Sequence, residues 1–274
     1  MLTTSGLKAL LKLHNLRLTK RLGQHHLVDP RVVERLLGRM SLSRDDTVVD
    51  IGAGLGALTE GLAQRAGSVV AVDVDQKICA LLRERLASHS NIAVVCGDIL
   101  EFPWSAYAGS IVVGAIPYHI TSLILVSLCD NRRAIREAWL ILQAEVAERL
   151  TAKPSTKAYG RLSVLGQYCW DMEKVMMIAR SAFFPQPEVD SMCLRLQPRS
   201  QPPVVVADEP LLFEVVKAAF AHRRKTLANC LSGLVSRAQA QTLLRQMGLP
   251  PSVRGEQLSL AQFAALASAL NSLR

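Results

Sequence analysis

The sequence predicts an α/β fold, in which a doubly wound, Rossmann-like parallel sheet is followed by a small all-helical C-terminal domain. Two observations carry this prediction. Short apolar runs rich in β-branched residues alternate with helical patterns over residues 47–113, which is typical of a parallel sheet covered by helices. After residue 207 only helical periodicity remains and no strand pattern is found.

The first strand and the loop after it are the segment around which the chain is organised. Residues 48–51 predict a buried strand, and Gly52, Gly54 and Gly56 follow at alternating positions. Glycines permit positive φ and a close approach of the backbone to a ligand, and the helix expected from Ala57 offers free N–H groups. The loop predicts a nucleotide or nucleoside pocket. It fits both a dinucleotide fingerprint and the version that binds S-adenosylmethionine, and a tight turn without a ligand is the third interpretation.

Two acidic residues follow the next two strands. The strand at 68–73 ends in Asp73, and the strand at 92–96 is followed by Asp98. An acid about twenty residues past the glycine loop can accept the ribose hydroxyls, and in a methyltransferase the second acid accepts from the adenine amine. Either acid alone could be a solvated loop residue. Because the carboxyl ends of parallel strands meet at one edge, Gly52, Asp73 and Asp98 are expected at one site.

Aromatic residues beside prolines form a second candidate site. A fourth strand at 110–113 leads to Pro117 and Tyr118. Such a ring can stack on a flipped-out base, which contributes roughly 1–3 kcal/mol, although a turn proline and a core tyrosine would give the same pattern. Phe183 and Phe184 precede two further prolines, which exclude a helix interior. These rings should pack on the core or on a base.

The remaining elements complete the domain prediction. Helices are expected at 30–38, 76–87, 211–220, 227–235, 238–247 and 260–273, helical or mixed core segments at 123–128 and 134–150, a basic loop near the substrate at 153–165, and a linker at 199–207. The predicted division is a basic N-terminal segment at 1–22, either an amphipathic helix or an arm, a methyltransferase-like domain at 23–200 and a helical domain at 201–274.

The charge of the chain favours a polyanionic partner. The formal net charge is +9 and the pI is near 9.5. The first 28 residues contain five Lys and Arg and no acid, and a second basic cluster comprises Arg223, Arg224 and Lys225. Basic patches can serve solubility alone, but two of them beside a nucleoside pocket favour RNA or DNA.

Several classes of protein are disfavoured. No apolar run has membrane-spanning length, and no secretory signal is found. The six cysteines include no C-x-x-C pair, which indicates reduced thiols in the cytoplasm. His25 and His26 have no further ligands at helical spacing, so no metal is expected. The acid-free N-terminus also resembles an organelle transit peptide, which is our second interpretation of that segment. No long heptad pattern demands a partner, and we expect a monomer.

Beyond these patterns, the chain resembles the KsgA-type rRNA adenine dimethyltransferases over nearly its whole length. The matching segments are Gly23-Gln24-His25-x-Leu27, Asp50-Ile51-Gly52-x-Gly54-x-Gly56-x-Leu58-Thr59, Gly97-Asp98, Ile116-Pro117-Tyr118, Tyr159-Gly160-Arg161-Leu162-Ser163-Val164, Ser181-Ala182-Phe183-x-Pro185-x-Pro187-x-Val189-Asp190-Ser191 and Phe220-x-x-Arg223-Arg224-Lys225-Thr226-Leu227. The last three segments are more specific than the glycine loop, which many methyltransferases share.

The resemblance implies a function and a set of site residues. It implies transfer of four methyl groups from S-adenosylmethionine to two adjacent adenines near the 3′ end of 16S rRNA, within an assembling 30S particle. Donor binding is implied for Gln24, His25, Leu27, Gly52, Gly54, Gly56, Asp73, Asp98 and Ala115; the catalytic site for Ala115, Ile116, Pro117, Tyr118 and Phe183, with Tyr118 and Phe183 stacking on the base; and RNA binding for Arg223, Arg224 and Lys225.

Two residues depart from the family pattern. His26 stands where the family usually has phenylalanine, and Ala115 replaces the asparagine of the family motif Asn-Leu/Ile-Pro-Tyr. The second change removes a side-chain acceptor for the adenine amine. The alternatives left open are an assembly or RNA-binding factor without methylation, a large-subunit (23S) rRNA methyltransferase conferring antibiotic resistance, an organelle transcription factor and a dinucleotide oxidoreductase.

Overall fold

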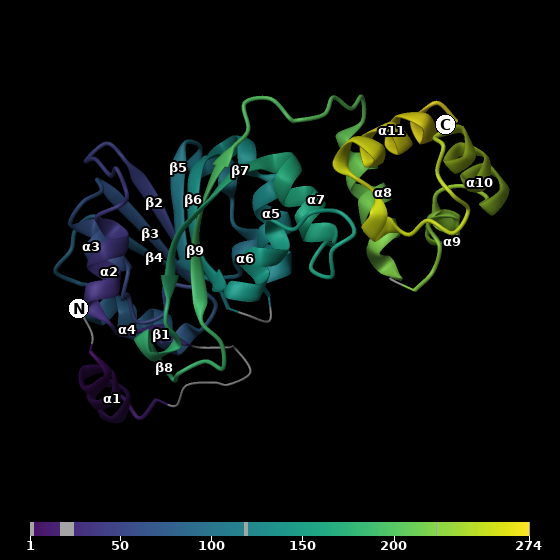
Figure 1. Cartoon of the computed structure of the whole chain (residues 1–274). Helices are drawn as coiled ribbons and strands as arrows, with labels where there is room; N and C mark the ends of the chain where they lie inside the picture. The colour runs from purple at the N-terminus through teal and green to yellow at the C-terminus, as the bar shows by residue number, and fades with distance from the viewer. Residues whose placement is uncertain (1–2, 17–24, 118–119, 223, 274) are drawn as a thin grey trace. The chain divides into compact units, whose positions relative to one another are not determined.

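The computed structural model describes residues 3–16, 25–117, 120–222 and 224–273. The chain forms two compact units. The first comprises Met1–Ala147 and Asp171–Pro198, and the second comprises Glu148–Trp170 and Arg199–Arg274. Figure 1 shows a large sheet with helices in the first unit and a group of helices in the second.

Seven strands form one sheet in the order β4-β3-β2-β5-β6-β9-β7. Their bounds are β2 (Thr47–Ile51), β3 (Ser68–Asp73), β4 (Ile92–Cys96), β5 (Ser110–Ala115), β6 (Ile135–Gln143), β7 (Trp170–Ile178) and β9 (Ser191–Pro198). Strands β2 to β6 pair in parallel, whereas β9 runs antiparallel to β6. The strand order reverses beside β2, and ligands of such sheets bind at this switch point, beyond the carboxyl ends of the strands.

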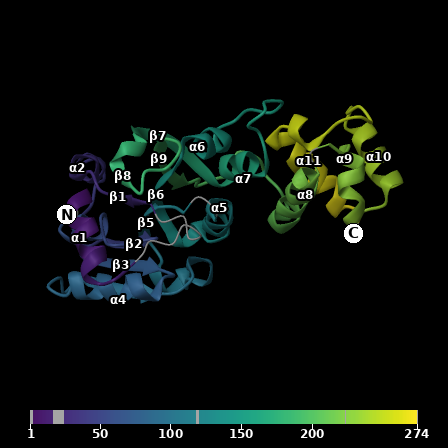
Figure 2. The same cartoon turned by 90° about the horizontal axis from the view of Figure 1, so that it is seen from below.

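Helices cover the sheet on both faces. They are α2 (Pro30–Leu37), α3 (Thr59–Ala63), α4 (Gln76–Arg85), α5 (Thr121–Asp130) and α6 (Ala144–Leu150). Leu36 and Leu62 pack with Val69 of β3, and Leu82 of α4 packs with Ala71. Residues two apart on a strand share a face, so α2, α3 and α4 cover one face, and α5 lies on the opposite side (Figure 2). Each buried leucine stabilises the fold by roughly 1.5–3 kcal/mol.

The N-terminal segment contains an amphipathic helix, α1 (Thr4–Leu13). Leu7 and Leu11 are buried in a cluster with Val28, Leu55 and Ile78. Residues 4–13 therefore belong to the first unit. Of the two predicted alternatives, they form the amphipathic helix and not an arm. The predicted segment beyond residue 16 lies outside the described residues until position 25.

Apart from Trp170, the first residue of β7, the regular secondary structure among the described residues of the second unit is helical. Its helices are α7 (Arg161–Cys169), α8 (Glu209–Ala221), α9 (Leu227–Cys230), α10 (Arg237–Gln246) and α11 (Leu260–Asn271). The Tyr159 hydroxyl donates to the Leu258 carbonyl at 2.9 Å, and the Tyr168 hydroxyl donates to Glu209 at 3.0 Å. These bonds join residues 148–170 to the C-terminal helices, so the structure divides the chain differently from the predicted boundary at residue 200.

Three predictions of secondary structure need correction. The loop expected at 153–165 ends at Gly160, whose N–H donates to Ser163 Oγ at 3.0 Å at the start of α7. The mixed segment at 134–150 is β6 followed by α6, and the sequence pattern gave no indication of β7 or β9. Strand β7 was missed because charged residues interrupt it, with Asp171, Glu173 and Lys174 exposed.

Candidate functional site

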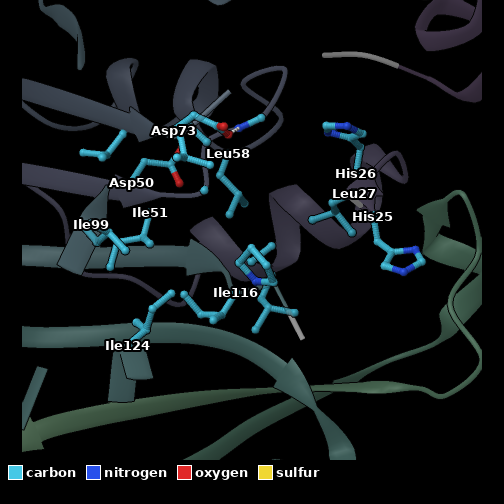
Figure 3. Close-up of a pocket in the computed structure, with 18 of the residues that line it drawn as sticks. His25, His26, Leu27, Asp50, Ile51, Leu58, Asp73, Ile99, Ile116 and Ile124 are labelled. Atoms are coloured by element: carbon cyan, nitrogen blue, oxygen red, sulfur yellow. Dashed lines mark hydrogen bonds between the residues drawn. The ribbon is translucent and has the colours of Figure 1, made fainter. Parts of the chain in front are cut away.

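A cavity of about 280 Å³ lies beyond the carboxyl ends of β2, β3, β4 and β5. It is lined by His25, His26, Leu27, Asp50, Ile51, Gly52, Ala53, Gly54, Ala57, Leu58, Val72, Asp73, Val74, Gly97, Asp98, Ile99, Ala115, Ile116, Pro117, Ile120, Ile124, Ile141, Phe183 and Ser191. Figure 3 shows how ten of these side chains lie around it. The site is therefore at the switch point where the topology predicts a ligand.

The glycine loop forms one wall of the cavity. Gly52 and Gly54 both have positive φ, at 65° and 53°. The Gly54 N–H donates to Asp73 Oδ2 at 2.8 Å, which ties the loop to the end of β3. A Cβ atom on Gly54 would lie 2.8 Å from His26 Nδ1, so no larger residue fits at this position.

Gly56 differs from the two glycines before it. It also has positive φ, at 79°, but it does not line the cavity. A Cβ atom here would lie 2.7 Å from Leu82 Cδ1 on α4. The structure therefore explains Gly56 by loop conformation and packing, and not by lining the cavity as the prediction of donor binding would require.

Asp73 and Asp98 reach the cavity from the ends of β3 and β4. Asp73 accepts from the Gly54 N–H and, at 3.0 Å, from the Asp75 N–H. Burial is the largest influence and raises the pKa of Asp73, although these hydrogen bonds oppose it. Asp98 is exposed and accepts from the Leu100 N–H at 2.9 Å. The two predicted acids thus lie at one site.

Asp50 is a third acid in the cavity, and the sequence motifs assigned it no role of its own. Its side chain is 1% exposed, and Thr59 Oγ1 donates to Asp50 Oδ2 at 2.6 Å. Burial raises the pKa of Asp50 to about 7; the Thr59 hydrogen bond opposes this shift and the charge of Asp73 adds to it. The signal that could have found it is an acid inside an apolar strand, two residues before the first glycine.

The histidine pair lines the cavity beside the glycine loop. Strand β1 (His26–Leu27) pairs antiparallel with β8 (Phe183–Phe184). The His25 ring is 2.7 Å from the Pro185 carbonyl through Nδ1. Burial, and then the charge of His25, lower the pKa of His26 to about 4, and His26 Nε2 has no hydrogen-bond partner among the described residues. His26 is therefore a neutral imidazole near pH 7.

The loop after β5 forms the remaining wall. Ala115 is half-buried and Ile116 is 2% exposed. The Ile116 N–H donates to the Ile141 carbonyl at 3.1 Å. The Pro117 carbonyl accepts from Thr121 Oγ1 at 2.9 Å, which fixes the loop to the start of α5. Phe183 is 5% exposed.

Comparison with known proteins identifies the family of the chain. The family model described as ribosomal RNA adenine dimethylase matches residues 15–272. The chain belongs to this family. It is 40% identical over 281 residues to the ribosomal RNA small subunit methyltransferase A of Bacillus mycoides (strain KBAB4), covering 98% of this chain and 96% of the relative. The protein of the same name from Geobacillus thermodenitrificans (strain NG80-2) is 38% identical with the same coverage.

Solved structures of related enzymes agree with the fold. A dimethyladenosine transferase from Plasmodium falciparum matches with a TM-score of 0.74 and 24% identity, over 90% of this chain and 98% of that one. The 23S rRNA methyltransferase ErmE matches with a TM-score of 0.62 and 29% identity, over 89% of this chain and 99% of that one. The Rossmann-like methyltransferase fold with a helical C-terminal region is thereby confirmed.

The structure brings together most of the predicted site residues. Those lining the cavity are His25, Leu27, Gly52, Gly54, Asp73, Asp98, Ala115, Ile116, Pro117 and Phe183. Gln24, Tyr118 and Arg223 lie outside the described residues. Arg224 and Lys225 are exposed in the turn after α8, in the second unit. Apolar lining residues such as Ile99, Ile120 and Ile124 carry no sequence motif and were missed.

Among the residues that the structure describes, no helix is long and apolar enough to cross a membrane. Within the same ranges, no group of three His, Cys, Asp or Glu side chains is arranged to hold a metal ion.

Proposed function

We propose that this chain dimethylates two adjacent adenines near the 3′ end of 16S rRNA during assembly of the small ribosomal subunit, with S-adenosylmethionine as the methyl donor. The observation that carries the proposal is the cavity at the switch point, where the glycine loop, Asp73, Asp98 and the loop 115–117 meet. Relatives at 38–40% identity over almost the whole chain are named for small-subunit rRNA, which supports this substrate.

The residues of the cavity fit the donor. When bound, S-adenosylmethionine supplies a methyl group on a positively charged sulfur. We assign Asp73 as the acceptor for the ribose hydroxyls and Asp98 as the acceptor for the adenine amine, and both line the cavity. Gly52 and Gly54 leave room beside the backbone, and Ile99 offers an apolar contact at the same wall. Three acids and no Lys or Arg are found among the described lining residues, which suits a cationic ligand.

The loop 115–117 supplies the groups that would meet the target amine. The exocyclic amine of adenine is a poor nucleophile because its lone pair is delocalised, and hydrogen-bond acceptors can turn that lone pair toward the methyl group. The Ile116 carbonyl can serve as one acceptor. Ala115 has no side-chain oxygen, and the loss of one such bond costs roughly 1–3 kcal/mol, or about 5- to 150-fold in rate.

The base-stacking and RNA-binding roles rest on residues beside this loop and in the second unit. Phe183 lines the cavity, which supports a contact with the target base, and Tyr118 is proposed for the other face of the base from its place in the sequence motif. Arg224 and Lys225 are exposed and close together in the chain, as contacts to RNA phosphates require. We propose Arg223 as a third member of this cluster, and a monomeric cytoplasmic protein.

The test is methyl transfer from labelled S-adenosylmethionine to immature small subunits that lack the adenine methyl groups, with donor binding measured in parallel. Dimethyladenine in the product would support the proposal. Large-subunit particles serve as the control, because ErmE, a 23S rRNA methyltransferase, shares the fold. Label on large-subunit RNA alone would favour that alternative.

Ala115 favours a second candidate, an assembly factor that binds the RNA without methylating it. The variant Ala115→Asn restores the acceptor and distinguishes the two candidates. If the proposal holds, the variant methylates about 5- to 150-fold faster than the natural chain. Donor and particle binding without any methylation, in both the natural chain and the variant, would favour the binding factor.

A further inference from the structure

The donor cavity is acidic although the chain is strongly basic. Asp50, Asp73 and Asp98 line it, and no Lys or Arg does so among the described residues, while the whole chain carries a net charge of +9. His26 adds no positive charge near pH 7, because burial lowers its pKa to about 4. Acidic side chains therefore predominate around the cavity, and a cation is the ligand that they favour.

Of the three acids, Asp50 has the fewest groups around it that would stabilise a negative charge on its carboxylate. Both Asp73 oxygens accept backbone N–H groups, and Asp98 is exposed to water. Asp50 is 1% exposed, and Thr59, itself fully buried, is the hydrogen-bond partner of its carboxyl group among the described residues. Figure 3 shows the Asp50 side chain beside the cavity, near Asp73 and Leu58. A buried carboxyl group with one partner holds its proton unless a positive charge arrives.

We propose that Asp50, held by Thr59, is the counter-charge of the cationic methyl donor, and that it loses its proton to the solvent when the donor binds and keeps it when the demethylated product binds. This inference rests on the proposed function. S-adenosylmethionine and S-adenosylhomocysteine differ by the methyl group and the positive charge on sulfur, so an ionised Asp50 favours the donor. The same charge favours release of the product before the next of the successive methyl transfers.

The groups around Asp50 determine how this effect depends on pH. In β2, Asp50 lies between Ala71 of β3 and Val113 of β5. Strand β5 contains no titratable residue, β3 ends in Asp73, and β1 provides His26, which stays neutral between pH 6 and 8. On α3, Glu60 forms an ion pair with Arg85 at 2.5 Å, and α2 presents Arg31, Glu34 and Arg35, which are exposed.

The pKa of Asp50 in the cavity without ligand determines whether donor affinity rises or falls with pH. Burial raises the pKa of Asp50 to about 7, so about half of the molecules carry the proton at pH 7. A nearby positive charge lowers the pKa of a carboxyl group by about 1–3 units. Donor affinity should therefore rise with pH through this range and level off above it. The ratio of donor to product affinity should rise roughly fivefold to tenfold from pH 6 to pH 8.

Isothermal titration calorimetry of the full chain tests this proposal. S-adenosylmethionine and S-adenosylhomocysteine are titrated separately, in two buffers with different ionisation enthalpies, at pH 6, 7 and 8. We expect about half a proton to be released per donor bound at pH 7, and much less for the product. The product carries the same amino and carboxyl groups without the positive charge on sulfur, and the variant Asp50→Asn, titrated with the donor, controls for the titration of the donor's own groups.

Two variants test whether the proton released on donor binding comes from Asp50. Asp50→Asn keeps the shape of the side chain and an acceptor for Thr59, and it should abolish both the proton release and the pH dependence of the affinity ratio. Asp45→Asn removes an equal charge from an exposed position that does not line the cavity, and it should change neither. His25 also lines the cavity, and proton release that persists in Asp50→Asn would assign the effect to another group and overturn the proposal.

The remaining outcomes separate this inference from the proposed function. Donor binding without proton release, and with a pH-independent affinity ratio, overturns the role of Asp50 and leaves the methyl donor in place. Failure of the natural chain to bind S-adenosylmethionine at any pH overturns the donor itself, and with it both proposals. If Asp50→Asn does not fold, the comparison of donor with product on the natural chain still decides the proton release.

Discussion

The two units of this chain differ in charge far more than in size. The first unit contains 19 Lys and Arg against 18 Asp and Glu, whereas the second contains 13 against 5. Almost all of the net charge of +9 therefore belongs to the helical unit, while the cavity of the first unit is lined by three aspartates. The proposed ligands have the matching signs, since the methyl donor is a cation and RNA is a polyanion.

This difference shows how one chain can bind two ligands of opposite charge. A uniformly basic surface would attract RNA and repel a cationic donor. Screening confines the potential of exposed charges to about 8 Å in physiological salt, whereas charges inside a cavity are screened less. Variants of the donor-binding glycines and acids should therefore leave RNA binding unchanged, and variants of Arg224 and Lys225 should leave donor binding unchanged.

The largest effect is expected from the variant Gly54→Ala. Alanine at φ 53° is strained, and its Cβ atom would lie 2.8 Å from His26 Nδ1. Strain of about 1–2 kcal/mol, together with displacement of His26, should weaken donor binding roughly a hundredfold. Calorimetry with S-adenosylmethionine measures this loss, and RNA affinity should not change.

Gly109→Ala is the matched control for backbone strain. Gly109 has φ 81° and lies in an exposed turn before β5, where an added Cβ atom would have no neighbouring atom within 4 Å among the described residues. This variant should lower the melting temperature without changing donor affinity. Equal losses of donor affinity in both variants would show that strain in the fold, and not the shape of the cavity wall, determines binding.

The second effect concerns acid stability and is assigned to His26 in the first unit. The pKa of His26 is about 4 in the folded protein and 6.5 when unperturbed. The unfolded chain therefore binds more protons between these values, and stability is lost as the pH falls from about 6.5 to 4. His26→Phe should remove this loss and raise the free energy of unfolding by about 2 kcal/mol at pH 5 relative to its effect at pH 8. Denaturant unfolding at both pH values measures it.

His26→Gln separates titration from packing. Glutamine does not titrate, so this variant should also lose the pH dependence, although it cannot gain the apolar packing of phenylalanine. An unchanged pH dependence in both variants would contradict the assignment to His26. Its Nε2 atom is unpaired among the described residues, so His26→Phe should be the more stable of the two variants at pH 8.

The sequence predicted the part of the site that depends on local order along the chain. Gly52, Asp73 and Asp98 could be placed together because each follows a parallel strand, and parallel strands end at one edge. The role of Asp50 could not be predicted in this way. Its protonation depends on complete burial and on Thr59, and both follow from the packing of α3 on the sheet.

The division into units was harder to predict for a related reason. Residues 148–169 precede β7 and β9, the last two strands of the seven-stranded sheet along the chain, so continuity of the chain assigns them to the first domain. Their partners lie far along the chain, since Tyr159 bonds to Leu258 and Tyr168 to Glu209. Apolar periodicity identifies a buried face but not the element that covers it. The bulk of the fold is therefore readable from the sequence, and the contacts between distant segments are not.

The smallest effect is expected in the helical unit, from the double variant Arg224→Gln and Lys225→Gln. Both side chains are exposed in the turn before α9, and two exposed charge contacts contribute about 1 kcal/mol together, roughly fivefold in affinity. The more specific measure is the dependence of log affinity on log salt concentration, because each neutralised phosphate contributes about 0.7 to 0.9 to its slope. Loss of two contacts should lower the slope by roughly 1.4 to 1.8.

The double variant Lys77→Gln and Lys174→Gln is the control. It removes two exposed charges from the first unit and should leave the slope unchanged. Equal reductions in both double variants would mean that RNA responds to the net charge of the chain, and the electrostatic separation of the two units would then have no role in RNA binding.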